Sequence, residues 1–125
     1  MNTNSKKYVD GYIIPLKKKD VAKYKKMATW GASLWKKHGA LSYFECVGDD
    51  IAAKKSMGMG FIKLAKLKPD ETVVFSFVVY KSKADRDRIN KKVMSDPAMK
   101  DMDPTQMPVD MKRFVFGGFK TLVEG

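Results

Sequence analysis

The sequence predicts an α+β domain whose four strands and two helices follow the order β-α-β-β-α-β. Two observations lead to this fold class. Four segments are dense in β-branched and aromatic residues, which favour strands, and two segments carry apolar residues at the spacing of an amphipathic helix. This order is that of the split βαβ, or ferredoxin-like, arrangement, a four-stranded antiparallel sheet with both helices on one face.

The length of 125 residues fits a single domain, 1–125, since domains usually hold roughly 100–200 residues. A hydrophobic fraction of 44% is enough for a core of its own. One cysteine excludes an internal disulfide, and one cysteine with one histidine cannot supply four zinc ligands. We therefore expect no metal and no cofactor.

The first strand is predicted at residues 7–16, where Pro15 marks its end or an edge position. Asp20 is suited to cap a helix that begins at Val21. Along this helix apolar residues recur on one side and lysines occupy the other. Gly39 follows the helix as the residue that ends it.

The middle of the chain contains two further strands, at residues 40–48 and 72–80. The second of these is the clearest strand in the sequence. Residues 51–68 between them fit no single element, because part of the segment is typical of a loop and part fits either a short strand or a short helix.

The second helix is predicted to begin after Ser82, which forms a capping box with Asp85 in place of the usual Glu. Residues 97–110 are interpreted as an irregular connection with a helical turn or two. Residues 111–123 predict the last strand, with a bend or bulge at the two glycines 117–118.

The second face of the predicted sheet is unusual. An antiparallel sheet with water on one side alternates apolar and polar residues. In residues 43–47, 73–80 and 114–116, both alternating sets are mostly apolar. Because two helices cover only one face, we expect a second copy of the chain to cover the other around a two-fold axis. The result is a closed, barrel-like homodimer.

The net charge of +11 indicates either an anionic partner or a solvated basic surface. Residues 1–68 carry 15 basic and 5 acidic residues, whereas residues 69–125 carry 10 and 9. Only three of the 25 basic residues are Arg, the residue that forms planar contacts to phosphate. We interpret the excess as the outer face of the first helix. Contact with nucleic acid is the alternative.

The chain shows no apolar run near the ~20 residues that cross a bilayer. Its polar N-terminus has no secretory signal. Its single cysteine fits a reducing compartment. We therefore expect a cytoplasmic protein with no membrane contact.

Several blocks of the sequence resemble one known family. They are Tyr8–Tyr12, His38–Leu41, Glu45–Asp50, Asp70–Ser76, Lys92–Pro97 and Lys112–Lys120. Through them the chain is similar, over nearly its whole length, to the YbaA-like family of bacterial proteins of unknown function. That family is similar in architecture to the dimeric α/β-barrel superfamily. The resemblance thus implies a dimer, and it implies no established reaction.

Three residues are candidates for proton transfer: His38, Glu45 and Asp10. His38 ends the first helix and Glu45 lies midway along the next strand, so both can approach one pocket. The alternative is that His38 caps the helix and Glu45 meets a Lys or an Arg. Asp10 lies between aromatic residues and needs a partner. It is either a pocket base or half of an ion pair, for instance with Arg113.

Three aromatic residues, Trp35, Tyr43 and Tyr12, are candidates to line a pocket for a planar ligand, with core packing as the alternative. The sequence therefore predicts a homodimer that binds a small apolar or aromatic ligand between sheet and helices. If it is an enzyme, it works without a cofactor. The alternative function is a non-enzymatic dimeric module whose lysine-rich helix contacts an anionic partner such as RNA.

Overall fold

The computed structural model of the chain describes residues 1–52 and 58–125. Its strands are β1 (Tyr8–Lys17), β2 (Ser42–Val47), β3 (Glu71–Tyr80) and β4 (Val115–Lys120). Its helices are α1 (Val21–Lys37), α2 (Phe61–Leu64) and α3 (Lys83–Met94), joined by 3₁₀ turns at Lys18–Asp20, Pro97–Asp101 and Pro104–Gln106. The segment 51–68, for which the sequence predicted no single element, contains α2, and residues 53–57 of it lie outside the described residues.

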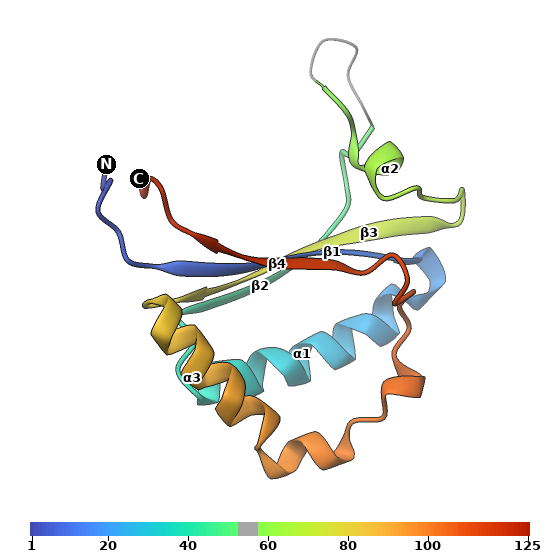
Figure 1. Cartoon of the computed structure of the whole chain (residues 1–125). Coiled ribbons are helices and arrows are strands. Elements are labelled where there is room, and N and C mark those ends of the chain that lie inside the picture. Colours follow the sequence, from blue (N-terminus) through green and yellow to red (C-terminus); the bar gives the residue numbers. More distant parts are fainter. Residues whose placement is uncertain (53–57) are drawn as a thin grey trace.

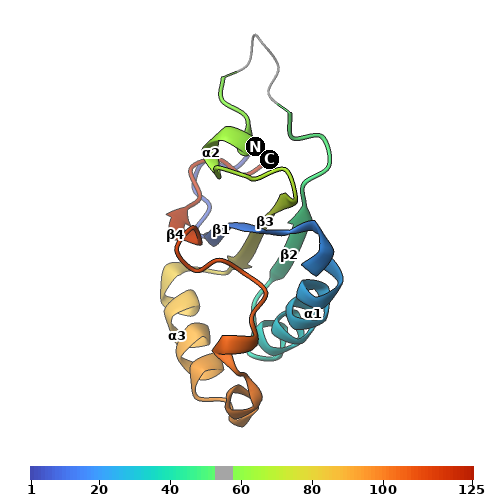
Figure 2. The same ribbon diagram turned by 90° about the vertical axis from the view of Figure 1, so that its right-hand side faces the viewer.

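The four strands form one sheet in the order β2-β3-β1-β4, and every neighbouring pair is antiparallel. Helices α1 and α3 lie on one face of the sheet, and α2 lies on the other (Figure 1). Figure 2 shows α1 and α3 side by side beneath the sheet, with the 97–114 connection returning to β4. This arrangement confirms the predicted ferredoxin-like fold. No helix among the described residues is long and apolar enough to cross a membrane.

Local signals account for the ends of both long helices. The chain leaves α1 through Gly39, whose φ of 113° is a conformation that favours glycine. The Ser82 hydroxyl accepts a hydrogen bond from the Asp85 amide at 3.1 Å and caps α3.

The last strand is shorter than its prediction, since it ends at Lys120 rather than at residue 123. It begins at Val115 rather than at residue 111, because Asp110 and Arg113 close a turn in front of it. The predicted bulge is wrong: β4 pairs with β1 in unbroken register through Gly117 and Gly118. Glycine serves a different purpose at position 118, where a Cβ would collide with the side chains of Arg86 and Tyr8.

The core lies between the sheet and the two long helices. Alternate residues of β3 are buried there, and Thr72 and Ser76 are the polar members of that set. The buried residues form two clusters. One contains Leu34, Ala40, Val78, Tyr80, Ile89 and Val93, and the other contains Ile14, Leu16, Tyr24, Ala28 and Val74.

The other face of the sheet is apolar and largely open. Phe44 stacks on Phe77 there with ring centroids 5.0 Å apart, and Phe61 of α2 meets the edge of Phe75. Phe75 is nevertheless 46% exposed and Phe119 is 62% exposed. From the strand register, the residues on this face are Val9, Gly11, Ile13, Pro15, Lys17, Ser42, Phe44, Cys46, Glu71, Val73, Phe75, Phe77, Val79, Val115, Gly117 and Phe119.

Candidate functional site

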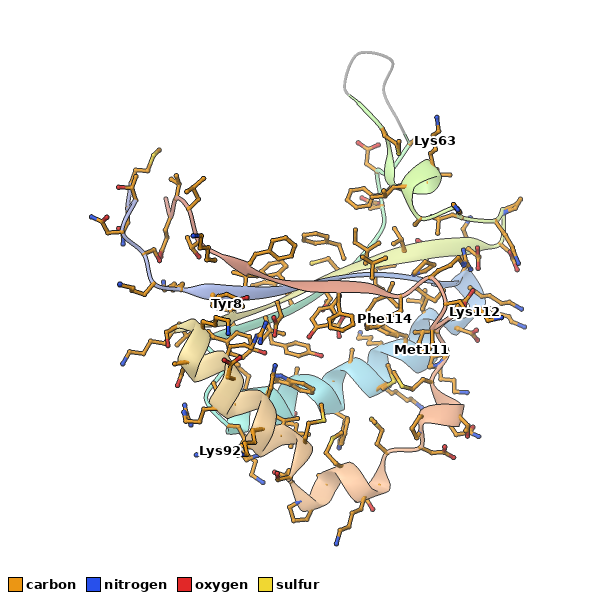
Figure 3. The ribbon with its side chains drawn as sticks, in the orientation of Figure 1. Tyr8, Lys63, Lys92, Met111, Lys112 and Phe114 are labelled. Atoms are coloured by element: carbon orange, nitrogen blue, oxygen red, sulfur yellow. The ribbon has the colours of Figure 1, made fainter. Side chains whose placement is uncertain are left out.

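A cavity of about 170 Å³ lies between the helix face of the sheet, α1 and the 97–114 connection. Figure 3 shows the ring of Phe114 on the α1 side of the sheet, next to the start of β4. The lining is mainly aromatic and aliphatic. It consists of Tyr12, Ile14, Tyr24, Met27, Ala28, Trp30, Gly31, Trp35, Tyr43, Glu45, Ser76, Val78, Met102, Met107, Val109 and Phe114.

The space exists because small residues face one another across it. Ala28 and Gly31 lie one turn apart on the buried side of α1, and Ser76 lies on β3. A Cβ at Gly31 would lie 3.0 Å from the Tyr43 hydroxyl, so the missing side chain lets that hydroxyl approach the helix. Larger residues at these positions would fill the cavity.

Glu45 brings a carboxylate to the cavity. It lies on β2 opposite Ser76 in register, and its side chain is on the helix face of the sheet. The Tyr24 hydroxyl donates to Oε1 at 2.7 Å and the Tyr43 hydroxyl donates to Oε2 at 2.9 Å. Burial, and then the charge of Glu45, raise the pKa of both phenols well above the usual range. Both phenols therefore stay protonated and act as donors.

Tyr12 forms the part of the wall nearest β4. Its ring stacks on Phe116, with centroids 6.1 Å apart, and meets Phe114 edge-on at 5.9 Å. Burial, helped by the charge of Asp10, raises the pKa of Tyr12 to about 12. The ring therefore contributes a neutral hydroxyl and an aromatic face.

Trp35 is held in place by helix α3. Its indole nitrogen donates to Asn90 Oδ1 at 3.1 Å, and the Tyr80 hydroxyl donates to the same oxygen at 3.1 Å. The indole lies 6.2 Å from the ring of Tyr43, measured between centroids. These contacts hold the Trp35 ring at the wall of the cavity.

His38 lies away from this cavity. Its Nε2 is 2.7 Å from Asp96 Oδ2, and Lys37 Nζ reaches the same oxygen at 2.9 Å. The Ala98 amide also donates to Asp96 at 2.9 Å. That amide, followed by His38 and Lys37, holds the pKa of Asp96 far below its usual range. The structure thus places His38 in a link between α1 and the end of α3, and does not bring it together with Glu45.

Asp10 also has a structural partner. It is 6% exposed and binds Arg86 of α3, with Nε 3.1 Å from Oδ1. The suggested pairing with Arg113 is wrong, because Asp10 lies opposite Gly118 while Arg113 precedes β4 at its other end. Arg113 instead binds Glu71: its Nη1 donates to Oε1 and its Nη2 donates to Oε2.

The lysines of α1 divide into two groups. At the C-terminal end, Lys36 donates to the Leu41 carbonyl at 2.8 Å, and Lys37 pairs with Asp96. Lys25 and Lys26 are exposed on the outer face of the helix. Part of the basic charge therefore serves the fold.

Several lining residues were not among the sequence candidates. Tyr24 follows the helical core spacing, and Met102, Met107 and Phe114 come from or just beyond an irregular connection, so local pattern does not assign them to a cavity. One signal was available. Ser76 interrupts the apolar run from Val73 to Tyr80, and it indicates a place where the core is not filled.

Comparisons with known proteins place the chain in a family. The family model described as "Protein of unknown function (DUF1428)" matches residues 7–111. The uncharacterized protein YbaA of Escherichia coli K12 is 42% identical over 120 residues, which cover 94% of this chain and 98% of the relative. YbaA of Shigella flexneri matches with the same identity and coverage.

One solved structure is similar in fold. It is a nipsnap family protein of unknown function from Agrobacterium tumefaciens, with a TM-score of 0.57, 15% identity, and coverage of 95% of this chain and 91% of that one. At this identity the likeness shows the fold alone. Since the family model spans most of the chain and YbaA matches over nearly its whole length, the chain belongs to the DUF1428 family of proteins of unknown function.

Proposed function

We propose that this protein is a cytoplasmic homodimer that binds a small, largely apolar or aromatic ligand in the cavity between its sheet and α1. The observation that carries the proposal is the cavity of about 170 Å³ with aromatic walls. An apolar cavity of ~150 Å³ is large enough for benzene. The volume therefore suits a single ring with a short substituent.

Glu45 is the residue at which proton transfer would occur if the ligand is also a substrate. Of the three candidates, it alone lines the cavity, whereas His38 and Asp10 are engaged in ion pairs elsewhere. Its carboxylate can accept a proton from a bound molecule while Tyr24 and Tyr43 hold it in position.

The open face of the sheet supports the homodimer. Its residues at the centre of the sheet are apolar or glycine, and exposed apolar patches of this kind mark interfaces. A second copy of the chain presents the same face, so a two-fold axis can cover both patches at once. Helix α2 covers part of β3 and leaves the remainder open for that contact.

The anionic-partner alternative rests on the exposed lysines of α1 and is tested separately. RNA binding that falls steeply with salt, with a slope flattened by Lys25→Ala and Lys26→Ala, would favour it over ligand binding. If an RNA column does not retain the protein at low salt, RNA binding is excluded.

Tryptophan fluorescence tests ligand binding directly. The chain has two Trp, and both Trp30 and Trp35 line the cavity. We expect saturable changes in emission on titration with toluene or phenol. Ala28→Leu should abolish them, because it places an isobutyl group in the cavity. Ala22→Leu is the matched control, since Ala22 is exposed on the same helix.

Two results would contradict the proposal. One is unchanged emission with both probes. The other is binding that survives Ala28→Leu as well as it survives Ala22→Leu, because the probes would then bind elsewhere.

A further inference from the structure

The carboxylates placed deepest in the sheet and helix layers have basic partners. Asp10 is 6%, Glu71 9% and Asp96 8% exposed, and each forms an ion pair. The pairs are Asp10 with Arg86, Glu71 with Arg113, and Asp96 with Lys37 and His38. This is the expected arrangement, because a buried charge without a partner costs free energy.

Glu45 departs from this arrangement. Its side chain makes no ion pair in residues 1–52 and 58–125. No Lys, Arg or His from those residues lines the cavity, and Lys25 lines a separate groove that Glu45 also borders. The chain has 25 basic and 14 acidic residues, so cations are in excess. The hydrogen-bond donors to the Glu45 carboxylate are nevertheless two neutral phenols.

The two phenols satisfy only part of the hydrogen-bond accepting capacity of the Glu45 carboxylate. A carboxylate has about four acceptor sites, and Tyr24 and Tyr43 use one on each oxygen. A wholly apolar ligand would expel water from the remaining sites and leave the charge uncompensated. A ligand with its own carboxylate would be repelled. A ligand with a positive group would supply the missing partner.

The walls favour the same kind of ligand. Trp30, Trp35 and Tyr12 surround the cavity with aromatic faces, and such faces attract ammonium groups as well as apolar rings. Met27, Met102 and Met107 add adaptable apolar surface.

One groove that adjoins the cavity is acidic, whereas another contains Lys25 beside Glu45. The acidic groove shares Met27, Trp30, Met102 and Met107 with the cavity, so the two adjoin between α1 and the 97–114 connection. Its charged residues are Asp101, Asp103 and Lys23. The hydroxyl and amide of Thr105 hold the pKa of Asp103 below its usual range. A local excess of negative charge in a chain of +11 favours the approach of cations.

We propose that the ligand of this cavity is a small amine: a protonated amino group on one aromatic or compact apolar body, with the ammonium bound to Glu45. This inference rests on the proposed function and names its ligand class. The ring lies among Trp30, Trp35 and Tyr12, and the ammonium donates to the free acceptor sites of the Glu45 carboxylate.

The test compares 2-phenylethylamine with 2-phenylethanol, which has the same ring and chain length but no charge. Isothermal titration calorimetry and tryptophan emission measure the affinity of the protein for each compound. We expect the amine to bind about tenfold or more tightly than the alcohol, which is the range of one hydrogen bond to a charged group. Glu45→Gln should remove that preference. Asp49→Asn, at an exposed site, removes the same charge and should change neither.

The outcomes separate the two proposals. If amine and alcohol bind equally to the wild type, or if the preference survives Glu45→Gln, the amine assignment is overturned while the binding cavity stands. If neither compound changes tryptophan emission, the binding function fails as well. Should Glu45→Gln not fold, the wild-type comparison and Glu45→Asp, which keeps the charge and should keep the preference, still decide.

Discussion

The open face of the sheet leads to a prediction about assembly. Phe75 lies at the centre of that face on β3, opposite Ile13, and is 46% exposed. A phenylalanine side chain buries about 200 Å² when covered, so ~90 Å² is left for a partner to cover. At about 25 cal/mol per Å², covering it contributes ~2 kcal/mol per copy, or ~4 kcal/mol in a symmetric dimer.

Phe75→Ser should therefore raise the dimer dissociation constant by about a thousandfold, since each ~1.4 kcal/mol is a factor of ten. Sedimentation velocity over a concentration series measures this constant. Phe116→Ser is the matched control. Phe116 is 70% exposed, but it lies on β4 opposite Tyr12, on the helix side of the sheet. Its replacement should leave the dimer unchanged.

A wild-type chain that sediments as a monomer throughout the series would refute the reasoning. So would a Phe75→Ser dimer as tight as the wild type. Far-ultraviolet circular dichroism establishes that the variant is folded, and Phe119→Ser, at a 62% exposed position on the same face, provides a second, independent disruption.

Three further predictions concern the fold. The pKa of Asp96 is depressed in the folded protein, so its contribution is present above its ordinary pKa of about 3.9 and is lost as the pH falls through the lower folded value. The melting-temperature gap between wild type and Asp96→Asn should persist down to about pH 5 and narrow below about pH 4, and a pH-independent gap would contradict the His38 and Lys37 contacts. Gly118→Ala should destabilise by about 1–3 kcal/mol in urea unfolding, because its methyl group displaces Arg86; an unchanged midpoint would show that Arg86 moves freely. Ser82→Ala should cost about 1 kcal/mol in the same assay, and no loss would mean that the cap hydrogen bond adds nothing.

The elements that local pattern predicts well are those whose limits are set locally. Helix α1 follows the apolar spacing from Val21 and ends at Lys37, two residues before Gly39, whose backbone conformation favours glycine. Strand β3 follows its run of β-branched and aromatic residues. The start of β4 was missed, because the turn in front of it depends on Arg113, which also binds the distant Glu71.

The cavity shows the same division. Tyr12, Trp35, Tyr43 and Glu45 were candidates from the sequence, and the structure places all four on its wall. Tyr24 was not among those candidates, since helical spacing does not distinguish a residue that fills the core from one that borders a space. That distinction depends on what faces it across the sheet.

The sequence by itself determined the order of the four strands and the two long helices, the apolar second face of the sheet and the family. These follow from periodicity and composition, which act over a few residues, and from matched blocks. Only the tertiary structure decided the partners of the charged groups. Asp10 meets Arg86 and not Arg113 because strand register sets which side chains lie within reach. The packing of α1 on the sheet brings Tyr24 to Glu45, and Tyr43 lies two residues before Glu45 on the same strand. Among the described residues, the lining of the cavity therefore contains a carboxylate and no cation.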